Sequence, residues 1–248
     1  MQPNSDKLTF LVGNAGILEN IDKLPAFRIF DDTVIAFLSA FSKTLSADPR
    51  TKRYPDVATL AFWCRKASVE SQKKPYAYLS NRLGRGVVFH IAPSNVAVNF
   101  AYSLVSGLLA GNANIVRLPS KDFEQVDIIC DAINNSLTES VRPYICLVKY
   151  ERSEDINAYL SLKCDTRIIW GGDNTIAEIR KAPLKPRANE ICFADRYSLC
   201  VINADRYLEE QNKQLIAQNF YNDTYLSDQN ACTSPRVIVW MGGSVDEA

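Results

Sequence analysis

The sequence predicts an α/β protein built on a doubly wound parallel sheet with helices on both faces. From residue 86 onward, short apolar segments alternate four times with segments of helical periodicity. The short segments are apolar on both faces, which is typical of strands buried in a parallel sheet. A polar-rich helical segment precedes this region, and a second α/β region follows it.

Residues 1–80 form the N-terminal segment, which we expect to be helical. Asp31 and Asp32 mark the start of one helix, and Pro55 with Asp56 marks the start of another. Apolar residues follow the first start at helical spacing, namely Val34, Phe37, Leu38, Phe41 and Leu45. We therefore expect both helices to bury one face.

Residues 81–187 form the expected central α/β domain. The predicted strands and helices alternate through it, with strands at residues 86–91, 113–118, 145–148 and 167–170 and helices at residues 95–110, 122–137, 153–162 and 174–181. Ligands of such folds bind outside the carboxyl ends of the strands. The loops after Ile91, Leu118 and Trp170 are therefore where a site is expected.

Residues 188–248 form the third part of the chain. Two prolines in the segment KAPLKPRANE interrupt the alternation and predict a domain boundary near residues 185–188. A strand at residues 199–203, a helix at 207–221 and a strand at 237–241 follow, with a polar loop before the last strand.

Composition excludes several functional classes. The 248 residues carry 28 basic and 28 acidic side chains, so the balance does not favour a nucleic-acid-binding protein. No apolar stretch approaches the roughly 20 residues that a membrane helix needs. The first residues, MQPNSDKLTF, lack the order of a signal peptide, so we expect a cytoplasmic protein.

Seven scattered cysteines include no C-x-x-C pair, which argues against a disulfide framework or a zinc site, and no metal is predicted. Most lie in apolar segments and are expected to be buried. The single histidine, His90, lies inside the first strand, and we expect it to be buried and hydrogen-bonded. A cysteine peptidase that pairs it with Cys232 has no support in the local sequence.

Candidate site residues lie in the loops that follow the strands. Ser94 and Asn95 interrupt two apolar stretches, where they either cap a helix or face a ligand. Arg117 stands at a strand end, where it either holds a ribose or 2′-phosphate or forms a surface salt bridge. Ser120 is either part of that site or a helix cap.

Three further candidates have weak local signals. Gly171 and Gly172 join a strand to a helix, where they form either a phosphate-binding turn or a plain tight turn. Glu190 is either a general base or a surface carboxylate. Cys232, among small polar residues, is either a nucleophile or a bystander.

Five segments, in this order, resemble the aldehyde dehydrogenase superfamily: GRGVVFHIAPSNVAVNF, LLAGNANIVRLPSK, IIWGGDNTIAEI, ANEICFADRYSLCVINAD and DQNACTSPR. Within it, the chain most resembles the LuxC-type acyl-CoA reductases, the fatty acid reductases of bacterial luminescence operons and their relatives. The resemblance implies a nicotinamide-binding domain at residues 81–187, and at residues 188–248 the first part of a catalytic domain, truncated soon after Cys232. In full-length form, a homo-oligomer or a complex is expected.

The resemblance also implies roles for individual residues. Cys232 falls on the nucleophile, Asn95 on the side-chain amide of the oxyanion hole, and Glu190 near the general base. Glu190 is followed by Ile-Cys-Phe where the superfamily has Leu-Gly-Gly, so its alignment is the least secure.

The cofactor-binding set follows in the same way. Arg117 falls on a lysine that holds the adenosine ribose, and its guanidinium favours NADPH. Gly171 falls on the glycine of a Gly-Ser turn beside the pyrophosphate, and Gly172 replaces the serine. Ser94 and Ser120 complete the set.

The implied reaction is the NADPH-dependent reduction of a fatty acyl group, from acyl-CoA or an acyl-protein, to the aldehyde through a cysteine thioester. Two alternatives within the superfamily are a short-chain CoA-acylating aldehyde dehydrogenase and a relative of γ-glutamyl-phosphate reductase. A third alternative is a non-catalytic nucleotide-binding fragment.

Overall fold

The computed structural model describes residues 7–225 and 228–247, and it divides the chain into two compact units, Met1–Ala194 and Asp195–Ala248. The N-terminal segment and the central domain expected from the sequence lie together in the first unit. The division falls after Ala194, beyond the proline-containing segment, because residues 189–193 form a strand of the first unit's sheet.

The first unit contains a six-stranded sheet in the order β1-β4-β3-β2-β5-β6. Its strands are β1 (Thr9–Val12), β2 (Val87–Ile91), β3 (Ala113–Arg117), β4 (Ile145–Lys149), β5 (Thr166–Trp170) and β6 (Asn189–Phe193). All neighbours are parallel except β1, which pairs antiparallel with β4. The predicted parallel α/β sheet is confirmed, with two further strands, β1 and β6, that the sequence pattern did not predict.

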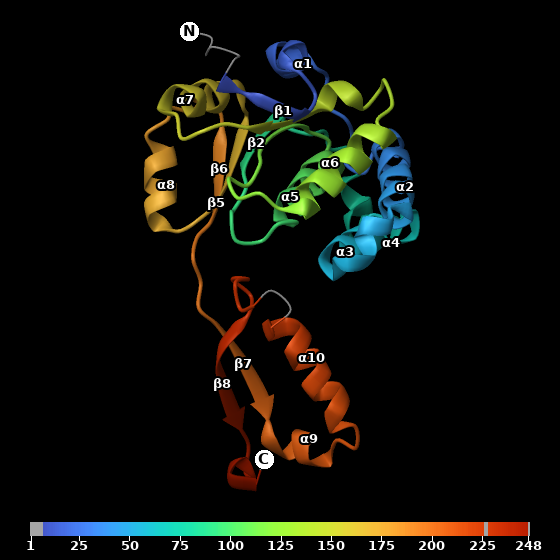
Figure 1. The fold of residues 1–248 in the computed structure, drawn as a ribbon, viewed down its shortest axis with the longest axis vertical. Helices are drawn as coiled ribbons and strands as arrows, with labels where there is room; N and C mark the ends of the chain where they lie inside the picture. Colours follow the sequence, from blue (N-terminus) through green and yellow to red (C-terminus); the bar gives the residue numbers. More distant parts are fainter. Residues whose placement is uncertain (1–6, 226–227, 248) are drawn as a thin grey trace. The chain divides into compact units, whose positions relative to one another are not determined.

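Helices cover both faces of this sheet (Figure 1). From β2 to β4 the chain advances in one direction, through α5 (Asn99–Leu109) and α6 (Glu124–Ser136). It then crosses back to β5 through α7 (Glu154–Lys163) and reaches β6 through α8 (Asp173–Arg180). Because parallel crossovers are right-handed, this reversal of direction puts the two helix pairs on opposite faces.

The N-terminal helices pack outside α5 and α6 as a third layer (Figure 1). The layer consists of α2 (Asp32–Ala47), α3 (Pro55–Trp63) and α4 (Lys66–Lys73), with short 3₁₀ turns at η3 (Pro49–Arg53) and η4 (Lys74–Leu79). The short helix α1 (Ala15–Asn20) and the turn η2 (Ile21–Lys23) follow β1, and the turn η5 (Arg142–Tyr144) precedes β4. The Asp31 carboxylate accepts the Thr33 N–H at the start of α2. The five apolar residues predicted to face inward are buried, as expected.

The helix expected from residue 95 begins only at Asn99, with Val98 as its N-cap. The chain between β2 and α5 forms turns instead, and Ala97 and Val98 already bury their side chains there. Ser94 and Asn95 are therefore loop residues with exposed side chains.

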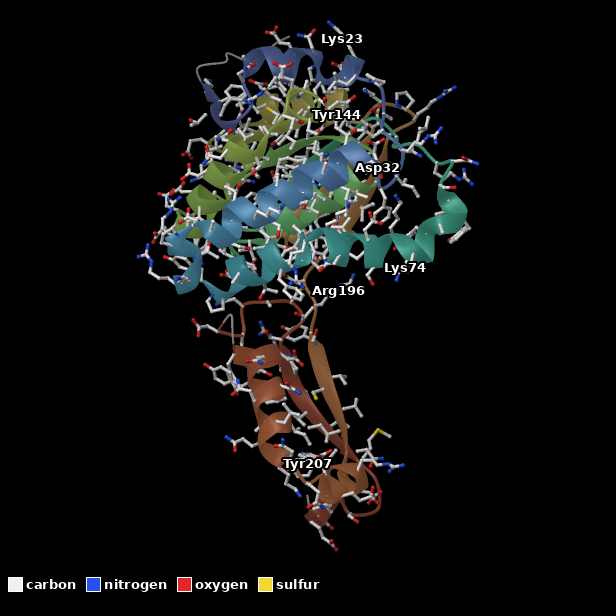
Figure 2. All side chains as sticks on the ribbon, turned by 90° about the vertical axis from the view of Figure 1, so that its right-hand side faces the viewer. Lys23, Asp32, Lys74, Tyr144, Arg196 and Tyr207 are labelled. Carbon is white, nitrogen blue, oxygen red and sulfur yellow. The ribbon has the colours of Figure 1, made fainter. Side chains whose placement is uncertain are left out.

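The second unit is a small α/β unit. Its parallel strands are β7 (Ser198–Asn203) and β8 (Pro235–Met241), joined by α9 (Ala204–Glu209) and α10 (Lys213–Tyr225), and η6 (Val245–Glu247) follows. One helix was expected where there are two, because the chain turns between Glu209 and Lys213. The ring of Tyr207, labelled in Figure 2, belongs to α9. It meets the ring of Trp240 edge-on with centroids 5.1 Å apart and anchors α9 to the strands.

One face of the two-stranded sheet is apolar and exposed, where Leu199 pairs with Val237 and Val201 with Val239. Within the described part of the chain, no helix is both long enough and apolar enough to cross a membrane.

Candidate active site

Three loops leave the first unit's sheet at one edge. Ile91, at the end of β2, pairs with Arg117 of β3 on one side and with Ile169 of β5 on the other. The strands are parallel and in register, so the residues that follow them emerge side by side. The structure thus groups at one edge the loops that carry Ser94, Asn95, Ser120 and the Gly171–Gly172 pair.

A contact between two hydroxyls joins the loops after β2 and β3. Ser94 Oγ lies 3.0 Å from Ser120 Oγ, and it also accepts the Ser120 N–H at 3.4 Å. Neither serine caps a helix, because α5 has Val98 and α6 has Phe123 at the N-cap. The capping alternative for both residues is therefore wrong, and the hydroxyls remain at the sheet edge.

The Arg117 side chain folds over Tyr150, which follows β4. Its Cζ lies 4.5 Å from the ring centroid, and its Nη2 donates to the Tyr150 carbonyl at 3.5 Å. None of the described carboxylates lies within ion-pair distance of Arg117, so it forms no surface salt bridge there. A guanidinium stacked on a ring and half-buried at a strand end can still turn its remaining donors to an anion.

The Gly171–Gly172 turn leaves the N-terminus of α8 open. Gly172 is the N-cap residue, and no side chain caps the first N–H groups of the helix. A Cβ on Gly171 would lie 3.0 Å from the side chain of Thr175, so the tight turn favours glycine there. Uncapped N–H groups at a helix start attract anions such as phosphate.

The chemistry of this edge fits a dinucleotide. It combines one guanidinium, two hydroxyls and an open helix N-terminus at the carboxyl ends of neighbouring parallel strands. Ribose hydroxyls and phosphates are the groups that such donors bind, and this is the edge where dinucleotides lie in doubly wound sheets.

Glu190 lies away from that edge, near the start of β6, where it pairs with Arg167 of β5. Arg167 Nε donates to its carboxylate at 2.9 Å, and Arg180 Nε donates to the other oxygen at 2.7 Å. Burial acts to raise the pKa of Glu190, but hydrogen bonds from Arg180 and Arg167 hold that pKa below its usual value. The carboxylate therefore carries a stable negative charge between two cations.

Arg167 is a buried cation whose burial no local sequence pattern predicts. It is only 2% exposed. Besides Glu190, it donates to the Ser161 hydroxyl at 3.0 Å and to the carbonyls of Ile179 and Ala182 at 3.2 and 2.9 Å. The full set of acceptors satisfies its guanidinium and ties the ends of α7 and α8 to the sheet.

Cys232 lies in the second unit, in the loop before β8, and its side chain is exposed. The Ser198 hydroxyl donates to the Cys232 carbonyl at 2.7 Å and fixes this loop to the start of β7. Asn95 and Cys232 thus belong to different units.

Four other cysteines are buried, as expected: Cys64, Cys130, Cys146 and Cys164. Burial raises the pKa of Cys64 to about 12 and that of Cys164 to about 11, so both remain thiols at neutral pH. Exposure distinguishes Cys232 from this group, because a reactive cysteine needs access to its substrate.

His90 is fully buried and hydrogen-bonded through both ring nitrogens, which confirms its predicted structural character. Its Nδ1 lies 2.7 Å from Ser103 Oγ, and its Nε2 lies 2.9 Å from Asn114 Oδ1. Burial lowers the pKa of His90 to about 4, so the ring is neutral at physiological pH.

An aromatic pair at the ends of β5 and β6 was also not predicted from the sequence. The rings of Trp170 and Phe193 stack with centroids 3.8 Å apart and planes 9° apart. Both residues end their strands and pair in register. Only the pairing of β5 with β6 reveals this contact, since the two residues are far apart along the chain.

Comparison with known proteins gives consistent results. The family model described as "Acyl-CoA reductase (LuxC)" matches residues 65–247. The long-chain acyl-protein thioester reductase of Aliivibrio fischeri is 23% identical over 165 residues, which are 65% of this chain and 33% of that protein. The NADP-dependent glyceraldehyde-3-phosphate dehydrogenase of Triticum aestivum is 27% identical over 171 residues, 68% of this chain and 32% of that protein.

Among solved structures, a NAD-dependent benzaldehyde dehydrogenase from Corynebacterium glutamicum is similar in fold. Its TM-score is 0.66 at 16% identity, and the match covers 100% of this chain and 63% of that one. The matched region spans about a third of the length of the curated relatives.

Proposed function

The chain belongs to the LuxC family of acyl-CoA reductases, and from this premise we propose that it reduces a fatty acyl thioester to the aldehyde with NADPH. The observation that carries the proposal is the common edge of β2, β3 and β5, where Arg117, Ser94, Ser120 and the Gly171–Gly172 turn emerge together. The names of several relatives, long-chain acyl-protein thioester reductases, support a long-chain acyl group as substrate.

The first half of the proposed reaction is acyl transfer to Cys232. The thiolate of Cys232 attacks the thioester carbonyl, the acyl–sulfur bond of the donor breaks, and the donor leaves as a thiolate that takes a proton from solvent. The exposed loop position of Cys232 supports this role, since the donor must reach the sulfur. We assign the oxyanion contact to the Asn95 amide, which lies in a loop at the cofactor edge.

The second half is reduction of the enzyme thioester. When bound, NADPH would supply the hydride that the acyl carbon needs. Release of the aldehyde would leave the Cys232 sulfur as a thiolate again. Residues of the first unit would hold and orient the cofactor: the open N-terminus of α8 would bind the pyrophosphate, and Arg117 would bind the adenosine ribose.

The preference for NADPH over NADH rests on Arg117. A guanidinium can donate two parallel hydrogen bonds to a 2′-phosphate, which NADH lacks. For Glu190, the contacts with Arg167 and Arg180 favour a structural ion pair over a base that activates water. Thioester reduction needs no such base.

The test is labelling with a radioactive long-chain acyl-CoA, followed by separation from free label. Wild-type protein is expected to retain label, Cys232→Ala to retain none, and Cys200→Ala, a matched change in the same unit, to retain it fully. Equal label on wild type and Cys232→Ala would refute the nucleophile. A series of acyl chain lengths separates this function from a short-chain CoA-acylating activity.

A further inference from the structure

We propose that Trp170 forms the aromatic wall on which the nicotinamide ring stacks, and that Ser103, His90 and Asn114 hold its indole in place. This inference rests on the proposed function, because it concerns the cofactor of that reaction. It adds a ring-binding residue and a set of positioning residues to the phosphate- and ribose-binding groups already described.

Trp170 has the right place in the sheet. It is the last residue of β5, directly before the Gly171–Gly172 turn. Phe193 lies against it at 3.8 Å and is 36% exposed, while Trp170 itself is half-buried. Stacked aromatic surface thus reaches solvent at the carboxyl edge, next to the loop that is expected to hold the pyrophosphate.

The order of the strands indicates which end of the dinucleotide would contact the surface formed by Trp170 and Phe193. Across the edge the strands run β3, β2, β5, β6, with Arg117 at the end of β3 and Gly171 directly after β5. A cofactor with its adenosine ribose at Arg117 and its pyrophosphate at Gly171 has its nicotinamide half directed towards β5 and β6. The stacked rings of Trp170 and Phe193 form a flat surface at the ends of these two strands.

The hydrogen bonds behind Trp170 have a single consistent direction. The Asn114 amide nitrogen donates to the Asn112 carbonyl at 2.8 Å, so its oxygen accepts from His90 Nε2–H. His90 Nδ1 is then an acceptor, and it takes the Ser103 hydroxyl proton. The Ser103 oxygen in turn accepts the Trp170 indole N–H at 3.2 Å.

Close packing fixes this chain of hydrogen bonds. His90 and Asn114 are both 0% exposed. A Cβ on Gly107 of α5 would lie 2.0 Å from Asn114 Oδ1 and 3.1 Å from His90 Nε2, so only glycine fits over the pair. A buried, fully satisfied polar chain rigidifies its surroundings. Here the polar chain fixes the orientation of the Trp170 indole at the edge of the site. Apolar contacts alone would not fix that orientation, because they have no direction.

The indole is chemically suited to this ligand. The oxidised nicotinamide ring is a cation, and Trp is the best side chain for attracting a cation to its face. Contact between an electron-rich indole and an electron-poor pyridinium also produces a charge-transfer absorption band that neither ring has separately. That band reports the contact itself, independently of catalysis.

The experiment titrates the full 248-residue protein with NADP⁺ and records difference absorption spectra and affinity. Wild type is expected to show a long-wavelength band that saturates with binding. Trp170→Leu should lose the band and bind about five- to tenfold more weakly. Trp63→Phe and Trp240→Phe should keep it, since neither indole is part of the proposed wall.

The positioning residues are tested by the same band. Ser103→Ala removes the acceptor of the indole N–H and should weaken or shift the band, whereas Ser106→Ala, an exposed serine on the same helix, should not. Thermal melts verify that each variant folds. Wild type that binds NADP⁺ without a band, or Trp170→Leu that keeps both band and affinity, would overturn the inference and leave the proposed function intact. Wild type that binds neither NADP⁺ nor NADPH would overturn both.

Discussion

The two ends of strands β5 and β6 differ in whether their side chains and backbone groups are satisfied by the protein or left open to a ligand. In the amino-terminal half, the buried Arg167 is paired with the partly buried Glu190, and protein groups satisfy both side chains. At the carboxyl end, Trp170 and Phe193 stack beside Gly171, and the helix that follows has no side-chain cap. A satisfied buried charge stabilises the fold, whereas donors left open at a strand end are available to a ligand.

The largest expected effect comes from breaking the amino-terminal pair. Glu190→Ala would leave the guanidinium of Arg167 buried without its counter-charge, and we expect it to destabilise the protein by about 3–5 kcal/mol. Urea unfolding followed by circular dichroism measures this. Lys181→Ala, an exposed cation in the same region, is the control and should change stability by less than about 0.5 kcal/mol.

The same variant distinguishes the two roles of Glu190. If Glu190→Ala keeps wild-type stability but abolishes reduction, the carboxylate is catalytic and the structural assignment is incorrect. Glu190→Gln, which keeps an acceptor for Arg167, should lie between wild type and the alanine variant in stability.

At the open edge, Asn95→Ala should act on the reaction and not on the fold. We expect acylation of Cys232 to slow by about 10²-fold or more, because one donor to the oxyanion is lost. Cofactor affinity and melting temperature should stay at wild-type values, because the side chain is exposed in a loop. Rapid-quench labelling with acyl-CoA measures the rate, and an unchanged rate would remove Asn95 from the oxyanion site.

Much of this arrangement follows from the sequence. Apolar segments of strand length and intervening helical periodicity were sufficient to predict the parallel sheet and the loops at its carboxyl edge. A histidine among apolar residues had to be buried and hydrogen-bonded, and His90 is. Helix boundaries were harder to place, because the burial of Ala97 and Val98 before α5 depends on tertiary packing.

Other features depend on pairings that no local pattern contains. Arg167 looks like a polar residue on a strand, and its burial requires the ends of α7 and α8 to supply carbonyls. The segment after Lys185 reads as a linker because of its prolines, yet it continues into β6. Without β6, neither the Arg167–Glu190 pair nor the Trp170–Phe193 stack can be foreseen.

As the pH falls, the titration of His90 should lower the stability of the protein before protonation of Glu190 does. The folded pKa of His90, about 4, lies below its ordinary value of 6.5, so unfolding takes up a proton when the pH falls below about 6.5. We expect stability to be constant above that pH and to fall by about 2 kcal/mol between pH 6.5 and 5. The carboxylate of Glu190, with its lowered pKa, loses its contribution only at lower pH.

Unfolding curves at a series of pH values measure this slope. His90→Gln, which has no titrating group, should be less stable at neutral pH but flat between pH 6.5 and 5. A wild-type slope that persists in the glutamine variant would mean that another group titrates there.

The smallest expected effect concerns cofactor choice at the open edge. Arg117→Lys keeps the positive charge but loses the planar pair of donors, so the preference for NADPH over NADH should fall by about tenfold. NADH affinity should change little, because NADH has no 2′-phosphate for the guanidinium to hold. Calorimetric titration with both cofactors gives the ratio directly, and Arg152→Lys, an exposed arginine in the loop after β4, is the matched control. An unchanged ratio would mean that the guanidinium does not contact the 2′-phosphate. Its stacking on Tyr150 would then be a structural contact, like those of the satisfied groups in the interior.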